Sequence, residues 1–428
     1  MKDCQTLPPV LIEKAEGIKL YDADGNFYYD TISSWWCNIH GHNHPKINQA
    51  IKKQLDSLEH VLFAGFTHKT AIILAEKLVS ITPQNLTKVF YSDNGSTSTE
   101  TALKMSFQYW QNIGKKSKTK FVSLDKAYHG DTLGAMSVGG VEEFNKLFSP
   151  LFLPSFKVPS PYCYRCPMGK EKDRCDIDCI GPLEQIVKNN SDKIAAMILE
   201  PLVMGAAGII VYPKEYLERA AAIVKKYNIH LILDEVATGF GRTGKMFACE
   251  HAGVEPDFIC LSKGITAGYL PLAATLTTDE IYQAFYDDYE NKKTFCHGHT
   301  YTANPVACVA AIASLEIFDQ QKSLDKAGRI VPLLRDGIEK FASLRFVGDV
   351  RHIGLIAAIE IVKDKKSKTP FDPNERIGYR IYKKGLENKL LLRPLGNVVY
   401  LFLPLCITKQ DLTCIVDTFY GIIKAIDA

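Results

Sequence analysis

An acid and a lysine each follow a short apolar run in the middle of the chain. Asp234 lies near the end of HLILDEV (230–236), and Lys263 follows DFICLS (257–262). A buried carboxylate is costly unless a cation accompanies it. A lysine after a strand can bind a phosphate, remain in solvent, or form a Schiff base with an aldehyde. The separation, 263 − 234 = 29 residues, fits one strand–helix–strand step.

This pair suits pyridoxal phosphate, which needs a lysine for its aldehyde and an acid that keeps its pyridine nitrogen protonated. The stretch YSDNGSTSTETALKM offers a phosphate cradle, because Gly95 and Ser96 lie in a turn before a helix whose first amides can hold an anion. Tyr128 follows the run KFVSL (120–124) and is a candidate aromatic slab. Alone, the turn could be an ordinary helix cap and Tyr128 a packing residue. Together with the acid and the lysine, they predict a cofactor site.

The residues named so far follow apolar runs that alternate with helical patterns. This alternation predicts an α/β domain with a mostly parallel sheet, in which ligands bind at the carboxyl ends of the strands. Strands are predicted at 88–92, 120–124, 195–201, 230–236 and 257–262, and helices at 98–110 and 215–229.

The two ends of the chain predict a smaller α+β domain. The segment 17–30 reads as a hairpin with a DG turn, and we expect it to pack with the C-terminal part. That part predicts strands at 355–362 and 397–404, a helix at 375–389 and a final helix. The predicted division is 1–45 and 319–428 for the two parts of the small domain, and 46–318 for the large cofactor-binding domain.

Composition argues against several classes of partner. The chain has 428 residues, 46% of them hydrophobic, and a net charge of +3. The charges are interspersed rather than gathered into a basic stripe, so no nucleic-acid partner is expected. No apolar run reaches membrane-spanning length, and the first residues lack the organisation of a signal peptide. The expectation is a soluble cytoplasmic protein.

The quoted motifs together resemble the class III (omega) aminotransferases of fold type I. The stretches that carry the resemblance are DEVATGFGRTGK, LSKGITAGYLPLAA, NGSTSTETALK, YHGDT and HGHTYTANPVAC, and it runs over nearly the whole chain. It implies that Lys263 binds pyridoxal 5'-phosphate covalently and that Asp234 pairs with the pyridinium. It also implies that Gly95 and Ser96 hold the phosphate and that Tyr128 stacks on the ring.

The same resemblance extends the cofactor site to HGHTYT. It implies that His299 and Thr300 bind the cofactor, and that Thr300 reaches the phosphate in the neighbouring subunit. The implied assembly is therefore a homodimer with shared active sites.

The tetrapeptide SSWW (33–36), followed by IHGHNHP, resembles one branch of this family, the 7,8-diaminopelargonate synthases of biotin biosynthesis. These enzymes transfer an amino group, usually from S-adenosylmethionine, to 8-amino-7-oxononanoate. The similarity of LLRPLGNVVYL to their C-terminal motif puts Arg393 on the substrate carboxylate and Tyr400 beside it. Trp35 is then expected to line the channel for the alkyl chain, with Trp36 packed behind it.

Three further residues complete the implied substrate contacts. They are Gly298, which allows close backbone approach, Tyr128, and Arg242 within GFGRTG. Arg242 could instead be the structural arginine of a turn.

Some alternatives remain open at the level of sequence. The chain begins MKDCQTLPPV and lacks a tyrosine-bearing, HPYT-like segment common in this branch, so the donor could be S-adenosylmethionine or another amine such as lysine. An omega-aminotransferase acting on ornithine, 4-aminobutyrate or a diamine would share the cofactor residues and differ at SSWW, Arg393 and Tyr400. A non-enzymatic cofactor-binding protein would not need the pair Asp234 and Lys263.

Four clustered cysteines raise the question of a metal. Cys163, Cys166, Cys175 and Cys179 have the spacing C-x2-C-x8-C-x3-C, which could ligate zinc or an iron–sulfur cluster. They lie in a polar insertion with Pro and Gly, and the favoured interpretation is a surface excursion with reduced thiols that catalysis does not need. No metal is expected there or at the histidines of NIHGHNHP.

Overall fold

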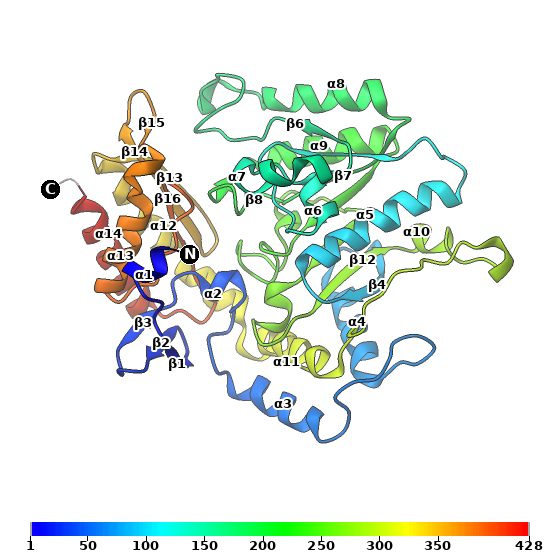
Figure 1. Cartoon of the computed structure of the whole chain (residues 1–428), viewed down its shortest axis with the longest axis horizontal. Coiled ribbons are helices and arrows are strands. Elements are labelled where there is room, and N and C mark those ends of the chain that lie inside the picture. The colour runs from blue at the N-terminus through cyan, green and yellow to red at the C-terminus, as the bar shows by residue number, and fades with distance from the viewer. Residues whose placement is uncertain (1, 427–428) are drawn as a thin grey trace.

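The computed structural model describes residues 2–426. Two units lie side by side in Figure 1: one joins the blue N-terminal segment to the orange and red C-terminal segments, and the other holds the cyan, green and yellow middle of the chain. The predicted combination of an α/β unit with a smaller α+β unit from both termini is confirmed. The predicted boundary after residue 318 falls in the last turn of α11 (Pro305–Gln321).

A seven-stranded sheet forms the centre of the larger unit, in the order β4-β12-β11-β10-β7-β5-β6. Only β12 runs antiparallel to its neighbours β11 and β4, so the predicted mostly parallel sheet is confirmed. The strands are β4 (Leu86–Ser92), β5 (Lys120–Leu124), β6 (Ser155–Val158), β7 (Ile194–Leu199), β10 (His230–Asp234), β11 (Phe258–Leu261) and β12 (Ala273–Thr278). The sequence analysis did not predict β12.

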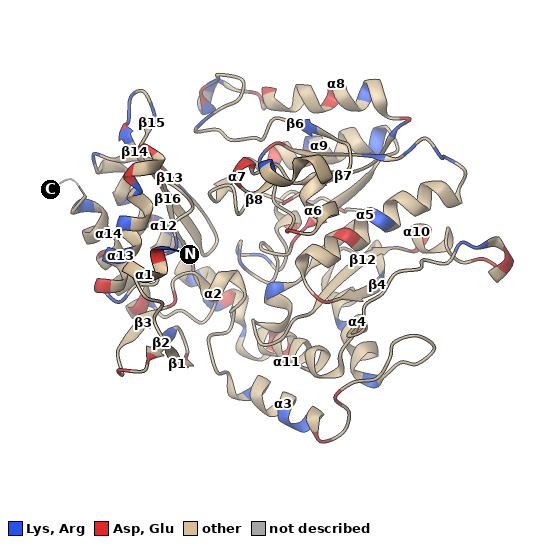
Figure 2. Ribbon diagram, in the orientation of Figure 1, with Lys and Arg blue, Asp and Glu red and all other residues tan. Residues whose placement is uncertain are grey.

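Burial on both faces explains why the central strands read as continuous apolar runs. Every residue of β7, β10 and β11 is buried, as expected for parallel strands between helical layers. Figure 2 shows the charged residues mainly on helices and loops, with both signs spread over both units. The helices of this unit are α3 (Pro45–Leu55), α4 (Lys69–Ile81), α5 (Gly95–Asn112), α6 (Leu133–Val138), α7 (Glu142–Asn145), α8 (Gly181–Asn190), α9 (Lys214–Lys226), α10 (Asp279–Gln283) and α11.

The smaller unit is built around β14 (Ile356–Asp364), which pairs with β13 (Val347–Ile353), β15 (Thr369–Pro370) and β16 (Val398–Phe402). Its helices are α12 (Ser323–Glu339), α13 (Ile377–Glu387) and α14 (Lys409–Lys424), and the N-terminal α1 (Asp3–Thr6) lies beside them (Figure 1).

The predicted N-terminal hairpin is present and packs on the C-terminal part. It consists of β2 (Lys19–Asp22) and β3 (Phe27–Tyr29), with β1 (Ile12–Glu16) as a third antiparallel strand. Tyr29 N–H donates to the Lys389 carbonyl at 2.8 Å, and Phe402 N–H donates to the Thr31 carbonyl at 2.8 Å. These bonds fix the segment that leads into SSWW against β16.

A buried arginine joins the two units near the carboxyl ends of the strands. Arg351 on β13 donates to the carbonyls of Ile209 (2.7 Å) and Gly208 (2.6 Å) in the larger unit. Its third nitrogen donates to Asp349 at 2.6 Å and to Glu360 at 3.2 Å. The receiving loop connects β8 (Val203–Met204) to β9 (Ile210–Val211).

Within residues 2–426, no helix combines the length and apolarity that crossing a membrane requires.

Candidate active site

Four neighbouring parallel strands each lead into one functional side chain. Asp234 is the last residue of β10, Glu200 directly follows β7, Lys263 lies two residues beyond β11, and Tyr128 lies in the loop after β5. All four line a cavity of about 650 Å³. The expectation that chemistry gathers at the carboxyl ends of the strands therefore describes this site well.

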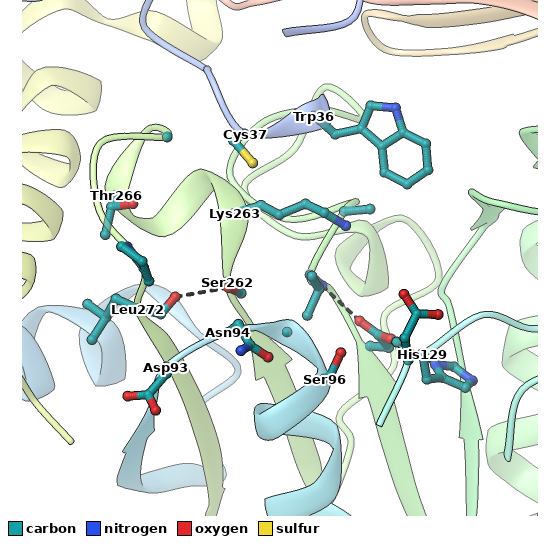
Figure 3. Close-up of a pocket in the computed structure, with 18 of the residues that line it drawn as sticks. Trp36, Cys37, Asp93, Asn94, Ser96, His129, Ser262, Lys263, Thr266 and Leu272 are labelled. Atoms are coloured by element: carbon teal, nitrogen blue, oxygen red, sulfur yellow. Dashed lines mark hydrogen bonds and ion pairs between the residues drawn. The ribbon is translucent and has the colours of Figure 1, made fainter. Parts of the chain in front are cut away.

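Lys263 extends into this cavity beneath an aromatic ring. Its Nζ lies 4.8 Å from the ring centroid of Trp36 (Figure 3). Burial lowers the pKa of Lys263, while the nearby carboxylate of Asp234 partly opposes that shift. A lowered pKa increases the share of neutral amine, which is the form that attacks an aldehyde.

The two carboxylate oxygens of Asp234 have different partners. Oδ2 lies 2.7 Å from Nδ1 of His129, and both side chains are almost fully buried. Oδ1 accepts a hydrogen bond from Val236 N–H at 3.0 Å. Asp234 thus caps the following turn and also belongs to the cavity wall, so His129 and Val236 fix the direction in which its charge acts.

The turn before α5 brings backbone close to the cavity. Asn94 caps the helix by accepting from Thr97 N–H at 3.1 Å, and Gly95 and Ser96 line the cavity. A Cβ on Gly95 would lie 2.7 Å from a methyl carbon of Val236, and one on Gly130 would lie 1.9 Å from Ser96 Oγ. Only glycine fits at these two close approaches, and the helix N-terminus faces the same space as the amine and the acid. This donor set fits pyridoxal phosphate: an anion cradle, an amine and a buried carboxylate.

Tyr128 forms part of the opposite wall. Its hydroxyl donates to Asp131 at 2.9 Å, and its ring meets Phe144 edge-on with centroids 5.8 Å apart. Its backbone N–H donates to Glu200 Oε1 at 3.0 Å. The position of the ring is therefore set by contacts at three points.

The two tryptophans of SSWW lie in different surroundings. Trp36 is 4% exposed and lines the cavity, whereas Trp35 is 55% exposed and does not. All four residues of SSWW have positive φ, between 44° and 71°, and this left-handed turn places the second indole beside Lys263. That Trp35 lines the substrate channel with Trp36 packed behind it stays a prediction, while in the single chain Trp36 is the indole that lines the cavity.

Arg242, expected as a substrate contact or as the structural arginine of a turn, is held by backbone and hydroxyl acceptors. It is 1% exposed and lies outside the lining of the cavity. Its guanidinium donates to the carbonyls of Trp36 (3.0 Å), Asn38 (3.1 Å) and Leu403 (2.8 Å), and to Ser33 Oγ (3.0 Å). Burial lowers its pKa to about 10. Arg242 fastens the SSWW turn, which matches the structural alternative.

The predicted carboxylate-binding residues lie beyond the tryptophans. The guanidinium of Arg393 is exposed and stacks 4.3 Å from the ring centroid of Trp35. Tyr400 is buried, and its hydroxyl accepts from Trp36 Nε1 at 3.2 Å. Arg393 borders a separate cavity of about 430 Å³, together with Asp3 and Arg376. The structure therefore links both residues to SSWW but not directly to Lys263.

The HGHTYT segment lies outside the cavity. Gly298 and Thr300 are exposed, and His299 Nδ1 lies 2.8 Å from Asp93, which does line the cavity. In the single chain, then, only His299 is connected to the cofactor space, and only through Asp93.

Two residues of the cavity were missed. His129 lies in the quoted motif YHGDT but was passed over beside Tyr128. Glu200 lies near the end of the run AAMILEP as Asp234 lies near the end of HLILDEV, so the argument used for Asp234 would have found it.

The four clustered cysteines are free thiols, three of them partly buried and Cys179 buried. Among the described residues, no three potential ligands are placed to hold a metal ion. That the insertion is dispensable for catalysis stays a prediction.

Comparison with known sequences decides the family. A family model described as "Aminotransferase class-III" matches residues 2–423. The chain belongs to the class-III aminotransferase family. It is therefore an aminotransferase of fold type I, and enzymes of this family and fold depend on pyridoxal phosphate.

Individual proteins similar to this chain are also named as aminotransferases. An adenosylmethionine-8-amino-7-oxononanoate aminotransferase of Geobacter sulfurreducens is 46% identical, over 97% of this chain and 92% of the relative. The crystal structure of the enzyme so named from Methanocaldococcus jannaschii superposes with a TM-score of 0.94 at 42% identity, covering 99% and 95% of the two chains. The crystal structure of an omega transaminase mutant from Pseudomonas jessenii superposes with a TM-score of 0.93 at 33% identity, covering 100% of this chain and 94% of the other.

The hydrogen bonds of Arg242 predict a stability defect that a substrate contact would not produce. Arg242→Ala leaves the carbonyls of Trp36, Asn38 and Leu403 without a donor, so the free energy of unfolding should fall by about 2–4 kcal/mol. Urea unfolding of the cofactor-free protein measures this change. The exposed Arg393→Ala is the control and should shift the free energy by less than about 0.5 kcal/mol. Equal small shifts in both variants would return Arg242 to the substrate site.

Proposed function

We propose that this aminotransferase uses pyridoxal 5'-phosphate to transfer an amino group, with S-adenosylmethionine as donor, to 8-amino-7-oxononanoate, giving 7,8-diaminononanoate in biotin biosynthesis. The observation that carries the proposal is the joined arrangement of Lys263, Trp36, Tyr400, Trp35 and Arg393. It supports a route from the reactive amine to an exposed guanidinium. Relatives 42–46% identical over nearly the full chain bear the corresponding name.

The residues of the cavity have distinct tasks in this reaction. Pyridoxal phosphate, when bound, supplies an aldehyde that holds the amino group and a protonated ring that stabilises negative charge. Lys263 Nζ would accept the proton from the reacting carbon of the substrate and later return it. The lowered pKa of Lys263 keeps the amine available as this base. Asp234, oriented by His129, keeps a negative charge beside the ring nitrogen. Gly95 and Ser96 supply backbone amides for the phosphate.

The structure of the proposed acceptor matches the side chains of SSWW and Arg393. 8-Amino-7-oxononanoate carries a carboxylate at one end and a ketone near the other, separated by a methylene chain. Each buried CH₂ contributes about 0.8 kcal/mol, which the indole rings of SSWW can provide. Arg393 can bind the carboxylate through two parallel hydrogen bonds, and it lies against Trp35 rather than in the cavity of Lys263.

The covalent role of Lys263 can be tested directly. Borohydride reduction of the cofactor-loaded protein should attach the cofactor to Lys263, as read by peptide mass mapping. Lys263→Ala should still bind cofactor without a covalent bond and lose transamination, because both the amine and the base are gone. An adduct on another lysine would reject the assignment. Lys292→Ala, an exposed lysine in a loop outside the cavity, is the control and should label normally.

The acceptor assignment depends on Arg393. Arg393→Ala removes a charge-assisted pair worth about 1.5–3 kcal/mol, so the half-reaction with 8-amino-7-oxononanoate should slow by about ten- to a hundredfold. Trp35→Ala should weaken the same half-reaction through the lost stacking of Arg393. The donor half-reaction should be unchanged in both variants. Single-turnover absorbance of the cofactor separates the two halves, and an unaffected acceptor half-reaction would favour a different omega-aminotransferase.

The donor is open to the same assay. S-adenosylmethionine, lysine, ornithine, 4-aminobutyrate and a diamine should be compared in the donor half-reaction at equal concentrations. Turnover with S-adenosylmethionine above the others supports the proposal, and preference for lysine would keep the acceptor while changing the donor.

We also propose a homodimer with shared active sites. Thr300 is exposed although it follows His299, which contacts the cavity residue Asp93. The next residue, Tyr301, is 63% exposed and its ring lies 5.2 Å from that of His60, and Phe66, six residues after His60, is 64% exposed. A lone subunit would leave these apolar side chains in water. A partner subunit would cover this surface and receive Thr300.

The dimer predicts complementation. Thr300→Ala and Lys263→Ala should each be inactive or nearly so as homodimers. Mixed dimers should recover up to about a quarter to a half of normal activity, because one of their two sites then has both native residues. Light scattering should give twice the mass of the chain. A fully active Thr300→Ala homodimer, or a monomer, would contradict the shared site.

All twelve cysteines are free thiols. This state suits a reducing compartment, and we expect the enzyme to work in the cytoplasm.

A further inference from the structure

Glu200 is a buried acid of the cavity for which the proposed reaction has no use. It is 5% exposed and lies between Asp234 on one neighbouring strand and the Tyr128 loop on the other. Its own backbone is fixed, because the Tyr212 hydroxyl donates to the Glu200 carbonyl at 2.6 Å. A buried acid with no catalytic task needs another reason for its place, since burial without partners is costly.

The two carboxyl oxygens reach opposite walls of the cavity. Oε1 accepts the backbone N–H of Tyr128 at 3.0 Å, and Oε2 accepts the backbone N–H of Gly205 at 2.8 Å. Tyr128 and the next residue, His129, form the wall that also orients Asp234.

Gly205 supports the other wall. A Cβ on Gly205 would lie 2.9 Å from the ring of Trp36, so the glycine backbone lies close against the indole. Lys263 Nζ lies 4.8 Å from the centroid of the same ring. The position of Gly205 therefore limits where the Trp36 ring can lie beside the reactive amine.

We propose that Glu200 is a positioning residue whose single carboxyl group holds the Tyr128 loop and the Gly205 loop, which supports Trp36, at a fixed separation, and hence sets the shape of the slot that receives the cofactor. This inference rests on the proposed use of pyridoxal phosphate but not on the identity of either substrate.

The electrostatic surroundings agree with a bridging role. Burial, followed by the negative charge of Asp234, raises the pKa of Glu200 to about 8. The charged or titratable groups that face it are Asp234, Lys263, Tyr128 and Tyr212. Near neutral pH Glu200 is therefore mostly protonated. It can accept both N–H bonds without adding a second full negative charge beside Asp234.

Glutamine tests the bridge because it preserves shape but not acceptor number. An amide has one acceptor oxygen and a donor NH₂ group, so Glu200→Gln can serve only one of the two N–H groups. Glu235→Gln is the matched control. Glu235 is the next residue after Asp234, is fully buried, accepts from Cys249 N–H at 2.8 Å and from Thr238, and does not line the cavity.

Two measurements besides activity decide the question. In Glu200→Gln, the dissociation constant for pyridoxal phosphate should rise about tenfold, and amide exchange in peptides covering residues 126–130 and 203–207 should accelerate about tenfold. Glu235→Gln should leave both within about twofold. Both half-reactions should slow by a similar factor in Glu200→Gln, because the donor and the acceptor use the same slot.

Clear results would overturn the proposal. Normal cofactor affinity and normal amide exchange in Glu200→Gln would remove the bridge, and equal losses in Glu235→Gln would reduce the effect to general stability. If Glu200→Gln does not fold, Gly205→Ala pushes the Trp36 wall while leaving the carboxyl intact, and unchanged cofactor affinity in that variant contradicts the proposal. Failure to use 8-amino-7-oxononanoate would affect only the proposed function, because neither cofactor affinity nor exchange depends on the acceptor.

Discussion

The parallel register of four neighbouring strands is the constraint on which the site depends. The interiors of β11, β10 and β7 are fully buried, so their side chains are committed to packing. Chemistry is left to the residues at the carboxyl ends. Because side chains alternate along a strand, a slip of one residue in β10 would replace Asp234 with Glu235, which now faces Thr238 and Cys249 instead of the cavity. Backbone pairing thus selects which of two adjacent acids meets the cofactor.

The two acids and the amine of the cavity differ in their partners. Asp234 shares its carboxylate between His129 and a backbone amide. Glu200, one strand away, has a pKa raised to about 8 by burial and by the charge of Asp234, so it carries a proton near neutral pH. The two equally buried carboxyl groups therefore have different surroundings. The amine of Lys263, with its lowered pKa, is not locked into an ion pair and stays available as a nucleophile and base.

Much of the fold followed from local pattern, and so did the centre of the site. Strand 120–124 was predicted with the bounds that β5 has, and Asp234, Lys263, Gly95, Ser96 and Tyr128 all line one cavity. β12 was missed because an antiparallel strand inserted between β4 and β11 has no signature in an alternating series. The role of Arg242 could not be predicted from sequence. Its acceptors include the carbonyls of Leu403 and Trp36, which are 161 and 206 residues away in the chain, and Trp36 lies in an unusual turn.

SSWW shows most clearly why sequence fell short. The resemblance assigned Trp35 to the substrate channel and Trp36 to packing behind it, but gave no sign that Trp36 would line the cavity beside Lys263. Four successive residues at positive φ cost about 1–2 kcal/mol each, and local preference would never select them. Tertiary contacts do: Asp30 accepts from Ser34 N–H at 2.9 Å, Ser33 donates to the Phe402 carbonyl at 2.6 Å, and Arg242 binds the turn from the larger unit.

The strained turn has a consequence for recognition. Its two indoles are adjacent in sequence, yet one contacts Lys263 and the other contacts Arg393. A relaxed strand would also separate them, but it could slide or twist with the smaller unit. The left-handed turn is instead tied to both units, through Arg242 in the larger and through the carbonyl of Phe402 in the smaller. The positions of the two indoles are therefore held by the same hydrogen bonds that stabilise the turn. In the proposed reaction the indoles contact the alkyl chain of the acceptor, so selection for that chain would reside in backbone geometry as much as in the two tryptophans.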